Sequence, residues 1–156
     1  MSALLNMWNK VSSKPGGKWL FTRGVCLKAP YFGTIKPMFQ ELSAEKAVVT
    51  FRERRAVHNH IKTVHAIAMC NSAELAGGLL CDVATPKGMR WIPKGMTVEY
   101  KNIAKGKLTA TATIEKIEVG EAREVITPVS VTNEAGVEVF RAEIKMWVSP
   151  SKKKAA

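Results

Sequence analysis

The stretch HNHIKTVHAIAMCNSAELAGG, residues 58–78, lies near the middle of this 156-residue chain and decides its fold. From Thr63 to about Leu80, small and apolar residues occur on every side of a helix rather than along one stripe, and a helix of that kind is usually buried. Glu74 is the one carboxylate in the stretch, and a buried carboxylate needs either polar partners or a chemical purpose. The adjacent Gly77 and Gly78 either end this helix or let another segment approach its backbone closely.

The segments on both sides of this helix predict the rest of the fold. Residues 1–30 indicate an N-terminal helical segment that the sequence KPGGK interrupts, and two strands are expected within residues 31–43 and 46–56. After residue 89 come four more strands, whose turns near Gly106, Gly120 and residues 133–136 favour an antiparallel meander. This order predicts an α+β fold in which one antiparallel sheet wraps around a long central helix.

Length and composition limit the classes of function. The length predicts a single domain over residues 1–150, followed by a basic tail at residues 151–156. No uninterrupted apolar run reaches the ~18–20 residues that span a bilayer, so no membrane span is expected. Three cysteines at unrelated spacings, without a basic region before the N-terminal apolar residues, predict reduced thiols in a cytoplasmic protein. No zinc-type cysteine and histidine pairing is present, so no metal site is expected.

The net charge of +11 predicts an affinity for anions, either nucleic acid, anionic lipid or a ligand that carries phosphate groups. Nucleic acid is not the expected partner, because the sequence has no helix-turn-helix, no aromatic strand motif of the RNA-binding type and no glycine-rich clamp.

Three residues of the central stretch carry a resemblance to a known family. Asn59, His65 and Glu74 resemble, in type and spacing, a motif of the hotdog-fold acyl-CoA thioesterases, the phenylacetate-pathway type in particular. Members carry an asparagine, then a histidine at the start of the central helix with two glycines after it, then an acidic residue further along. The similarity of sequence covers about residues 59–80, and the order of elements covers roughly the whole domain. Ala66 and Ile67 stand where the family has its two glycines.

The resemblance implies a hotdog fold and hydrolysis of an acyl-CoA thioester without a cofactor, coenzyme A being part of the substrate. Glu74 would act as the general base or the nucleophile, and backbone amides of Ala66 and Ile67 would form the oxyanion site at the helix start. Because Glu74 lies too far along the same helix, the family mechanism implies a homodimer, and such dimers often pair into tetramers. Asn59 either binds water or the substrate carbonyl or is a turn residue, and His65 either contacts substrate or caps the helix.

Several further residues are weaker candidates for the site. Asn71, Ser72 and Gly78 are expected to line the pocket or to contact the partner helix. Basic residues that follow the helix are candidates for the coenzyme A phosphates, chiefly Arg90, Lys101 and Lys105. His58 and His60 are interpreted as ordinary surface residues, and the aromatic residues Trp91, Tyr100 and Trp147 as core or dimer-contact residues.

Two other classes of function stay open. A hotdog dehydratase or hydratase requires His65 to lie close to a carboxylate. A non-catalytic protein that binds acyl-CoA or a fatty acyl chain would tolerate Ala66 and Ile67 in place of the family glycines.

Overall fold

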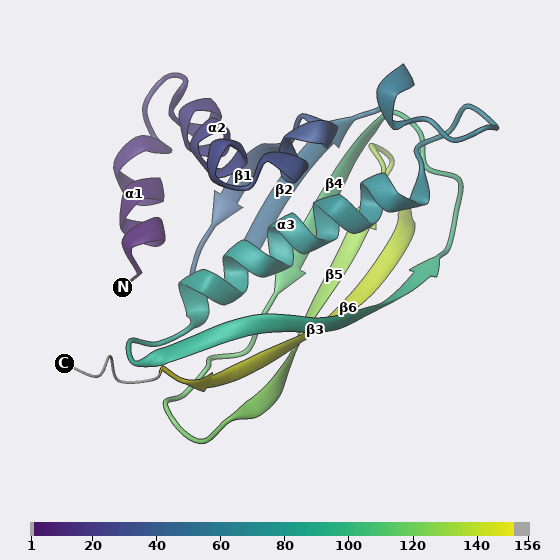
Figure 1. Cartoon of the computed structure of the whole chain (residues 1–156). Coiled ribbons are helices and arrows are strands. Elements are labelled where there is room, and N and C mark those ends of the chain that lie inside the picture. Colours follow the sequence, from purple (N-terminus) through teal and green to yellow (C-terminus); the bar gives the residue numbers. More distant parts are fainter. Residues whose placement is uncertain (1, 152–156) are drawn as a thin grey trace.

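A six-stranded antiparallel sheet curves around one long helix in the computed structural model, which describes residues 2–151 (Figure 1). The helix is α3 (Ala66–Ala84), and the strands are β1 (Met38–Leu42), β2 (Lys46–Arg52), β3 (Met89–Tyr100), β4 (Lys107–Thr113), β5 (Arg123–Thr132) and β6 (Glu138–Pro150). The expected α+β fold, with a sheet wrapped around a central helix, is therefore confirmed. Of the predicted basic tail, residues 152–156 lie outside the described residues.

Strict alternation along the strands creates the face that α3 covers. In β6, Phe140, Ala142, Ile144, Met146 and Val148 are buried, while each residue between them is exposed. Strand β4 alternates between buried and half-buried residues, and its buried residues include two alanines, Ala110 and Ala112. Small side chains on the sheet let the helix lie close to it, so that Leu75 and Leu80 of the helix are fully buried.

The strand order corrects the expected meander at one point. The sheet runs β1-β2-β4-β5-β6-β3, so β3 pairs with β6, and the turn near Gly106 joins two strands that are not neighbours. The other two turns join neighbouring strands, as expected. Turn residues show where a strand ends, but they do not show which strand lies beside it. Strand β3 therefore lies at one edge of the sheet.

The N-terminal helical segment consists of α1 (Ala3–Val11) and α2 (Gly17–Lys28), and a 3₁₀ helix, η1 (Pro30–Ile35), follows. An aromatic cluster joins α1 and α2 to strand β1 of the sheet. The ring centroids of Trp8 and Phe21 are 5.0 Å apart, and those of Phe21 and Phe39 are 5.5 Å apart. The expectation of a strand starting near residue 31 was wrong. Chain direction changes at Lys36, whose φ of 49° is left-handed, so the strand starts only at Met38.

Helix α3 begins three residues later than predicted and continues past the two glycines to Ala84. Gly77 does not end the helix but faces the sheet, where a Cβ atom would lie 2.8 Å from Ile144 Cδ1. Among the described helices, α3 alone is long enough and apolar enough by mean hydropathy to span a membrane. However, 67% of the 18-residue apolar window of this helix is buried inside the domain, which is typical of the core helix of a globular protein.

Candidate functional site

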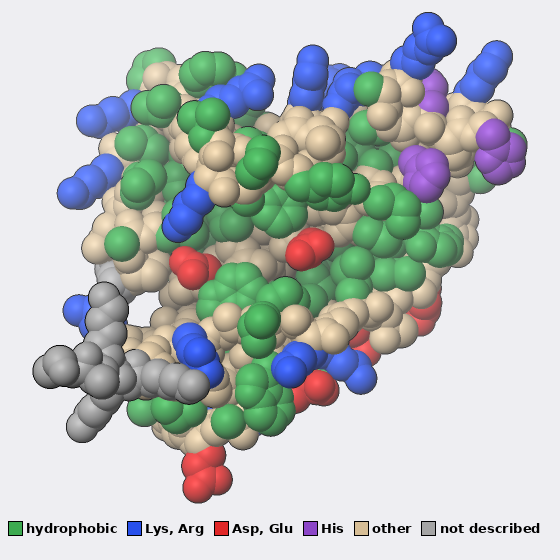
Figure 2. Space-filling model, viewed as in Figure 1, with side chains coloured by type: hydrophobic (Ala, Val, Ile, Leu, Met, Phe, Trp, Pro, Cys, Tyr) green, Lys and Arg blue, Asp and Glu red, His purple; other side chains and the backbone are tan. Residues whose placement is uncertain are grey.

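One face of α3 does not pack against the sheet, and Glu74 lies on it. Ile67, Glu74 and Asp82 are exposed and recur about every two turns, while most of the other residues of α3 are buried. The prediction that the helix is buried on all sides was wrong along this line, because the sheet encloses the helix only from one side (Figure 1). Figure 2 shows acidic side chains that stand among hydrophobic ones where α3 passes over β3.

The Glu74 carboxylate is exposed in the single chain and makes no hydrogen bond or ion pair with any of residues 2–151. The Cys70 thiol, one turn earlier, lies near the Tyr100 hydroxyl at the end of β3, and each group affects the pKa of the other. Burial raises the pKa of the Cys70 thiol, and the Glu74 charge acts in the same direction. Burial is also the main cause that raises the pKa of Tyr100, and the neighbouring Cys70 thiol raises it further. A thiol and a phenol that are both neutral at pH 7 therefore stand near an unpaired carboxylate.

The start of α3 is capped by a histidine. His65 is the N-cap residue, and its Nδ1 accepts a hydrogen bond of 3.0 Å from the amide of Ile67. Since that amide is already engaged, only one of the two predicted oxyanion donors is free. No acceptor among the described residues binds the amide of Ala66. Ala66 and Glu74 are eight residues apart, or about 12 Å along the helix axis.

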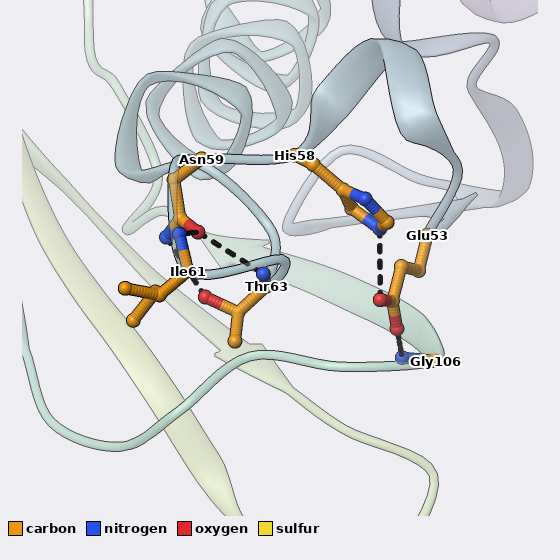
Figure 3. A network of polar contacts seen from close by, with 6 residues as sticks. All are labelled: Glu53, His58, Asn59, Ile61, Thr63 and Gly106. Atoms are coloured by element: carbon orange, nitrogen blue, oxygen red, sulfur yellow. Dashed lines mark hydrogen bonds and ion pairs between the residues drawn. The ribbon is translucent and has the colours of Figure 1, made fainter.

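Asn59 shapes the loop that leads to α3 (Figure 3). Its Oδ1 accepts hydrogen bonds from the amides of Ile61 (3.1 Å) and Thr63 (3.0 Å), and its Nδ2 donates to Thr63 Oγ1 (2.8 Å). Such bonds are those of a turn-forming asparagine. They leave one N–H of the side-chain amide without an acceptor among the described residues.

A second polar pair lies beside this loop and was not expected from the sequence. His58 Nε2 and Glu53 Oε1 are 2.9 Å apart, and Glu53 Oε2 accepts a hydrogen bond of 2.5 Å from the amide of Gly106. The Gly106 amide, more than the His58 ring, lowers the pKa of Glu53. The interpretation of His58 as an ordinary surface residue was therefore wrong, since the pair joins the loop before α3 to the loop before β4 (Figure 3). Glu53 and His58 are five residues apart, a spacing that does not predict a contact in a regular helix or strand. Here the 3₁₀ turn between them brings the two side chains together.

The predicted pocket residues have structural partners in the single chain. Asn71 Nδ2 donates to the Tyr31 carbonyl and to Thr34 Oγ1, so it fixes η1 against the helix. Its Oδ1 is buried without a partner among residues 2–151. The Ser72 hydroxyl is fully buried and donates to the Met69 carbonyl of its own helix. Gly78 lies beneath the Trp91 ring, where a Cβ atom would be 3.5 Å from Cη2.

The structure does not bring the three candidate phosphate ligands together within one chain. Arg90 lies at the start of β3 and Lys101 just after its end, roughly 36 Å apart along the strand. Lys101 already forms ion pairs of 3.4 Å with Glu99 and Glu138. Lys105 is exposed and follows Ala104, whose carbonyl accepts from the amide of Val64 beside the helix start. The hydrogen bond between Ala104 and Val64 therefore joins the loop of Lys105 to the loop that leads to Ala66.

Other surface features lie away from Glu74. A hollow of ≈ 870 Å³ is lined by the C-terminal turn of α3, including Asp82, and by Arg90 and Trp91 of β3. Neither Glu74 nor the helix start contributes to its lining. Tyr100 and Trp147 are 57% and 37% exposed, which excludes a core position for them and leaves the other predicted alternative, a dimer contact. His60 is exposed, as expected.

Comparison with known proteins identifies relatives of the whole domain. Residues 17–148 match the family described as domain of unknown function (DUF4442). A structural-genomics protein of known structure is 43% identical, with a TM-score of 0.82 over 95% of this chain and 98% of its own. No curated protein matches the chain.

More distant structures share the fold alone. A thioesterase from Haemophilus influenzae is 12% identical, with a TM-score of 0.69 over 81% of this chain and 87% of its own. A probable thioesterase from Pseudomonas aeruginosa is 19% identical, with a TM-score of 0.73 over 81% of this chain and 91% of its own.

Proposed function

This chain belongs to the DUF4442 family and has the hotdog fold of thioesterase-like proteins, and from that premise we propose that it hydrolyses acyl-CoA thioesters. The observation that carries the proposal is the position of Glu74. It is an exposed carboxylate without a partner among residues 2–151, on the one open face of an otherwise buried helix. A charge that stabilises nothing within its own chain is available for chemistry.

Glu74 would remove a proton from water, which attacks the thioester carbonyl, or would attack that carbonyl itself. In either case the carbonyl oxygen becomes an oxyanion, whose collapse breaks the C–S bond. On the first route the proton that Glu74 took from water passes to the leaving sulfur, and the free acid is formed. On the second route coenzyme A leaves as the thiolate and takes a proton from solvent, and water then hydrolyses the acyl–Glu74 anhydride, which releases the acid and restores the carboxylate. The free amide of Ala66, at the positive end of the α3 dipole, is suited to stabilise that oxyanion. No cofactor enters this scheme, and we place it in the cytoplasm, where acyl-CoA is available.

The proposed reaction would need a second copy of the chain. Glu74 and the Ala66 amide, about 12 Å apart on one helix, cannot both contact a single carbonyl group. Two helices that run antiparallel across a twofold axis would place Glu74 of one chain near the Ala66 amide of the other. The twelve-residue edge strand β3, with half-buried Met96 and Val98 and exposed Tyr100, offers a surface for such a dimer. A tetramer of two dimers remains an expectation from the family resemblance.

Exposed lysines in the two loops beside the start of α3 could bind the phosphate groups of coenzyme A. Lys105 and Lys62 are both exposed and belong to the two loops that meet beside Val64. Arg90 and Lys101 would join them only if the partner chain brought either residue to the same place.

Thiol release from short, long and aromatic acyl-CoAs tests the proposal. Glu74→Gln keeps the shape of the side chain and removes its charge, and the rate should fall about 10²–10⁴-fold, as for the loss of a general base. Asp82→Asn is the matched control, because Asp82 is an exposed carboxylate two turns further along the same helix. We expect that variant to retain nearly full activity. Turnover by wild type that survives in Glu74→Gln, or equal losses in both variants, would remove Glu74 from the mechanism.

A non-catalytic acyl-CoA binding protein is the second candidate, and the cap at His65 favours it. The hydrogen bond from the Ile67 amide to His65 Nδ1 leaves the helix start with fewer free donors than an oxyanion site usually has. Saturable binding of acyl-CoA without thiol release by wild type would establish this second function instead. A dehydratase is not proposed, since no carboxylate within residues 2–151 bonds to His65.

A further inference from the structure

Helix α2 is apolar on two opposite sides, and only one side is covered. Phe21, Thr22 and Cys26 are buried against the domain. On the other side, Leu20 and Leu27 are 60% and 83% exposed. A surface helix normally turns polar residues to solvent, so large exposed apolar side chains on the outer side indicate a contact with something else.

The exposed side of α2 also carries aromatic and basic groups. Trp19 is 52% exposed, and the guanidinium of Arg23 lies 5.5 Å from its ring centroid. At 100° per residue, Trp19, Leu20, Arg23 and Leu27 fall within an arc of about 100° around the helix. Tyr31, 65% exposed, follows in η1. We call Trp19, Leu20, Arg23, Leu27, Lys28 and Tyr31 the α2 face.

The charge around the α2 face has one sign. Residues 1–40 contain six basic residues, Lys10, Lys14, Lys18, Arg23, Lys28 and Lys36, and no aspartate or glutamate. In Figure 2, Lys and Arg side chains stand between hydrophobic ones over α1 and α2, while acidic side chains appear elsewhere on this side of the molecule. Across the whole chain, 13 acidic residues accompany 24 basic ones, so their absence from the first 40 positions concentrates the positive charge here.

We propose that the α2 face docks the protein on the surface of a bilayer that contains anionic lipid. Leucine side chains would enter the boundary between headgroups and acyl chains, while Trp19 and Tyr31 lie at the headgroup level, where amphipathic rings are favoured. The basic residues around them would contact lipid phosphates, each contributing to the attraction of an anionic leaflet. This combination of a basic helix with exposed tryptophan and leucine is what interfacial binding requires.

The positive charge of the α2 face favours an anionic bilayer, rather than a second copy of the chain, as its partner. A twofold contact of the α2 face with itself would set Arg23 and Lys28 against the same residues of the partner, with no acidic residue within positions 1–40 to offset them. An anionic bilayer supplies both the negative charge and the apolar layer that the face needs. The proposal does not depend on catalysis by Glu74, which lies on a different helix.

Co-sedimentation of the full chain with vesicles tests the proposal. Wild type should bind vesicles of equal parts phosphatidylglycerol and phosphatidylcholine, bind pure phosphatidylcholine much more weakly, and dissociate from the mixed vesicles as salt rises. Leu27→Ser should weaken binding to the mixed vesicles roughly tenfold, the effect of losing the burial of one leucine. Val119→Ser is the matched control, since Val119 is 69% exposed in the loop between β4 and β5, close in sequence to Glu118 and Glu121. This variant should bind as wild type does.

A further control separates the α2 face from the basic C-terminus. Changing the three lysines at 152–154 to glutamine should leave most of the binding intact. No binding by wild type at low salt would overturn the proposal, and so would binding that depends on those three lysines but not on Leu27. A concentration-dependent increase in molar mass that Leu27→Ser abolishes, without vesicle binding, would assign the face to a second copy and would also overturn it.

Discussion

Two adjacent glycines in α3 make a matched test of how closely the helix packs on the sheet. A Cβ atom at Gly77 would lie 2.8 Å from Ile144 Cδ1 and 3.3 Å from Thr127 Cγ2. A Cβ atom at Gly78 would meet only Trp91 Cη2 within 4 Å, at 3.5 Å, which is ordinary van der Waals contact. Both positions are buried in the same helix, so replacement by alanine adds the same methyl group in two different surroundings.

The expected free energies of unfolding follow from two opposing terms. Alanine is favoured over glycine inside a helix by about 1 kcal/mol at either position. At Gly77 the added methyl forces Ile144 of β6 to move, and overpacking of a tight core costs about 1–3 kcal/mol. Gly77→Ala should therefore lower the free energy of unfolding by up to about 2 kcal/mol, while Gly78→Ala should raise it by about 0.5–1 kcal/mol.

Urea denaturation followed by circular dichroism measures both values, at a fixed protein concentration because a dimer would couple stability to concentration. The two variants should differ by about 0.5–3 kcal/mol, with Gly78→Ala more stable than wild type and Gly77→Ala no more stable than wild type. A Gly77→Ala variant as stable as Gly78→Ala would show that the helix does not approach β6 as closely as the structure places it.

Three further predictions concern the loop before α3 and the cysteines. Asn59→Ala should lower the free energy of unfolding by about 1–2 kcal/mol in urea denaturation, and Asn59→Asp by less, because aspartate retains both acceptor bonds; equal losses would show that the acceptor bonds contribute nothing. The Gly106 amide and the His58 ring hold the pKa of Glu53 below its ordinary 4.5, so its stabilisation is complete above pH 4.5 and disappears as pH falls through the folded pKa. Glu53→Gln should therefore show a shallower loss of stability on acidification, and parallel acid denaturation curves would contradict this. Burial raises the pKa of Cys81 to about 11, so a thiol reagent at pH 8 should modify half-buried Cys70 first and Cys81 only after unfolding; equal rates in the native protein would refute this order.

Local pattern predicted most of the elements of this fold. The alternation of Leu108, Ala110 and Ala112 made β4 recognisable, and the dense apolar run after Thr63 made the central helix recognisable, because burial on one or all sides of an element leaves a period in the sequence. The family resemblance through Asn59, His65 and Glu74 led to the same fold.

Tertiary structure alone decided the features that depend on which segments meet. Strand β3 pairs with β6 rather than β4, since many sheet orders bury the same alternating residues equally well. Glu53 and His58 pair because a 3₁₀ turn and the loop at Gly106 converge, and no periodic pattern records such a contact.

The exposure of Glu74 is another feature that only the tertiary structure decided. The sequence by itself determined that a long apolar helix lies at the centre of the fold and that a single acid interrupts its middle. Only the packing of the chain determined that the sheet encloses α3 from one side and leaves Glu74 on the open one, because the direction of a helix face relative to its neighbours is set by contacts between distant residues.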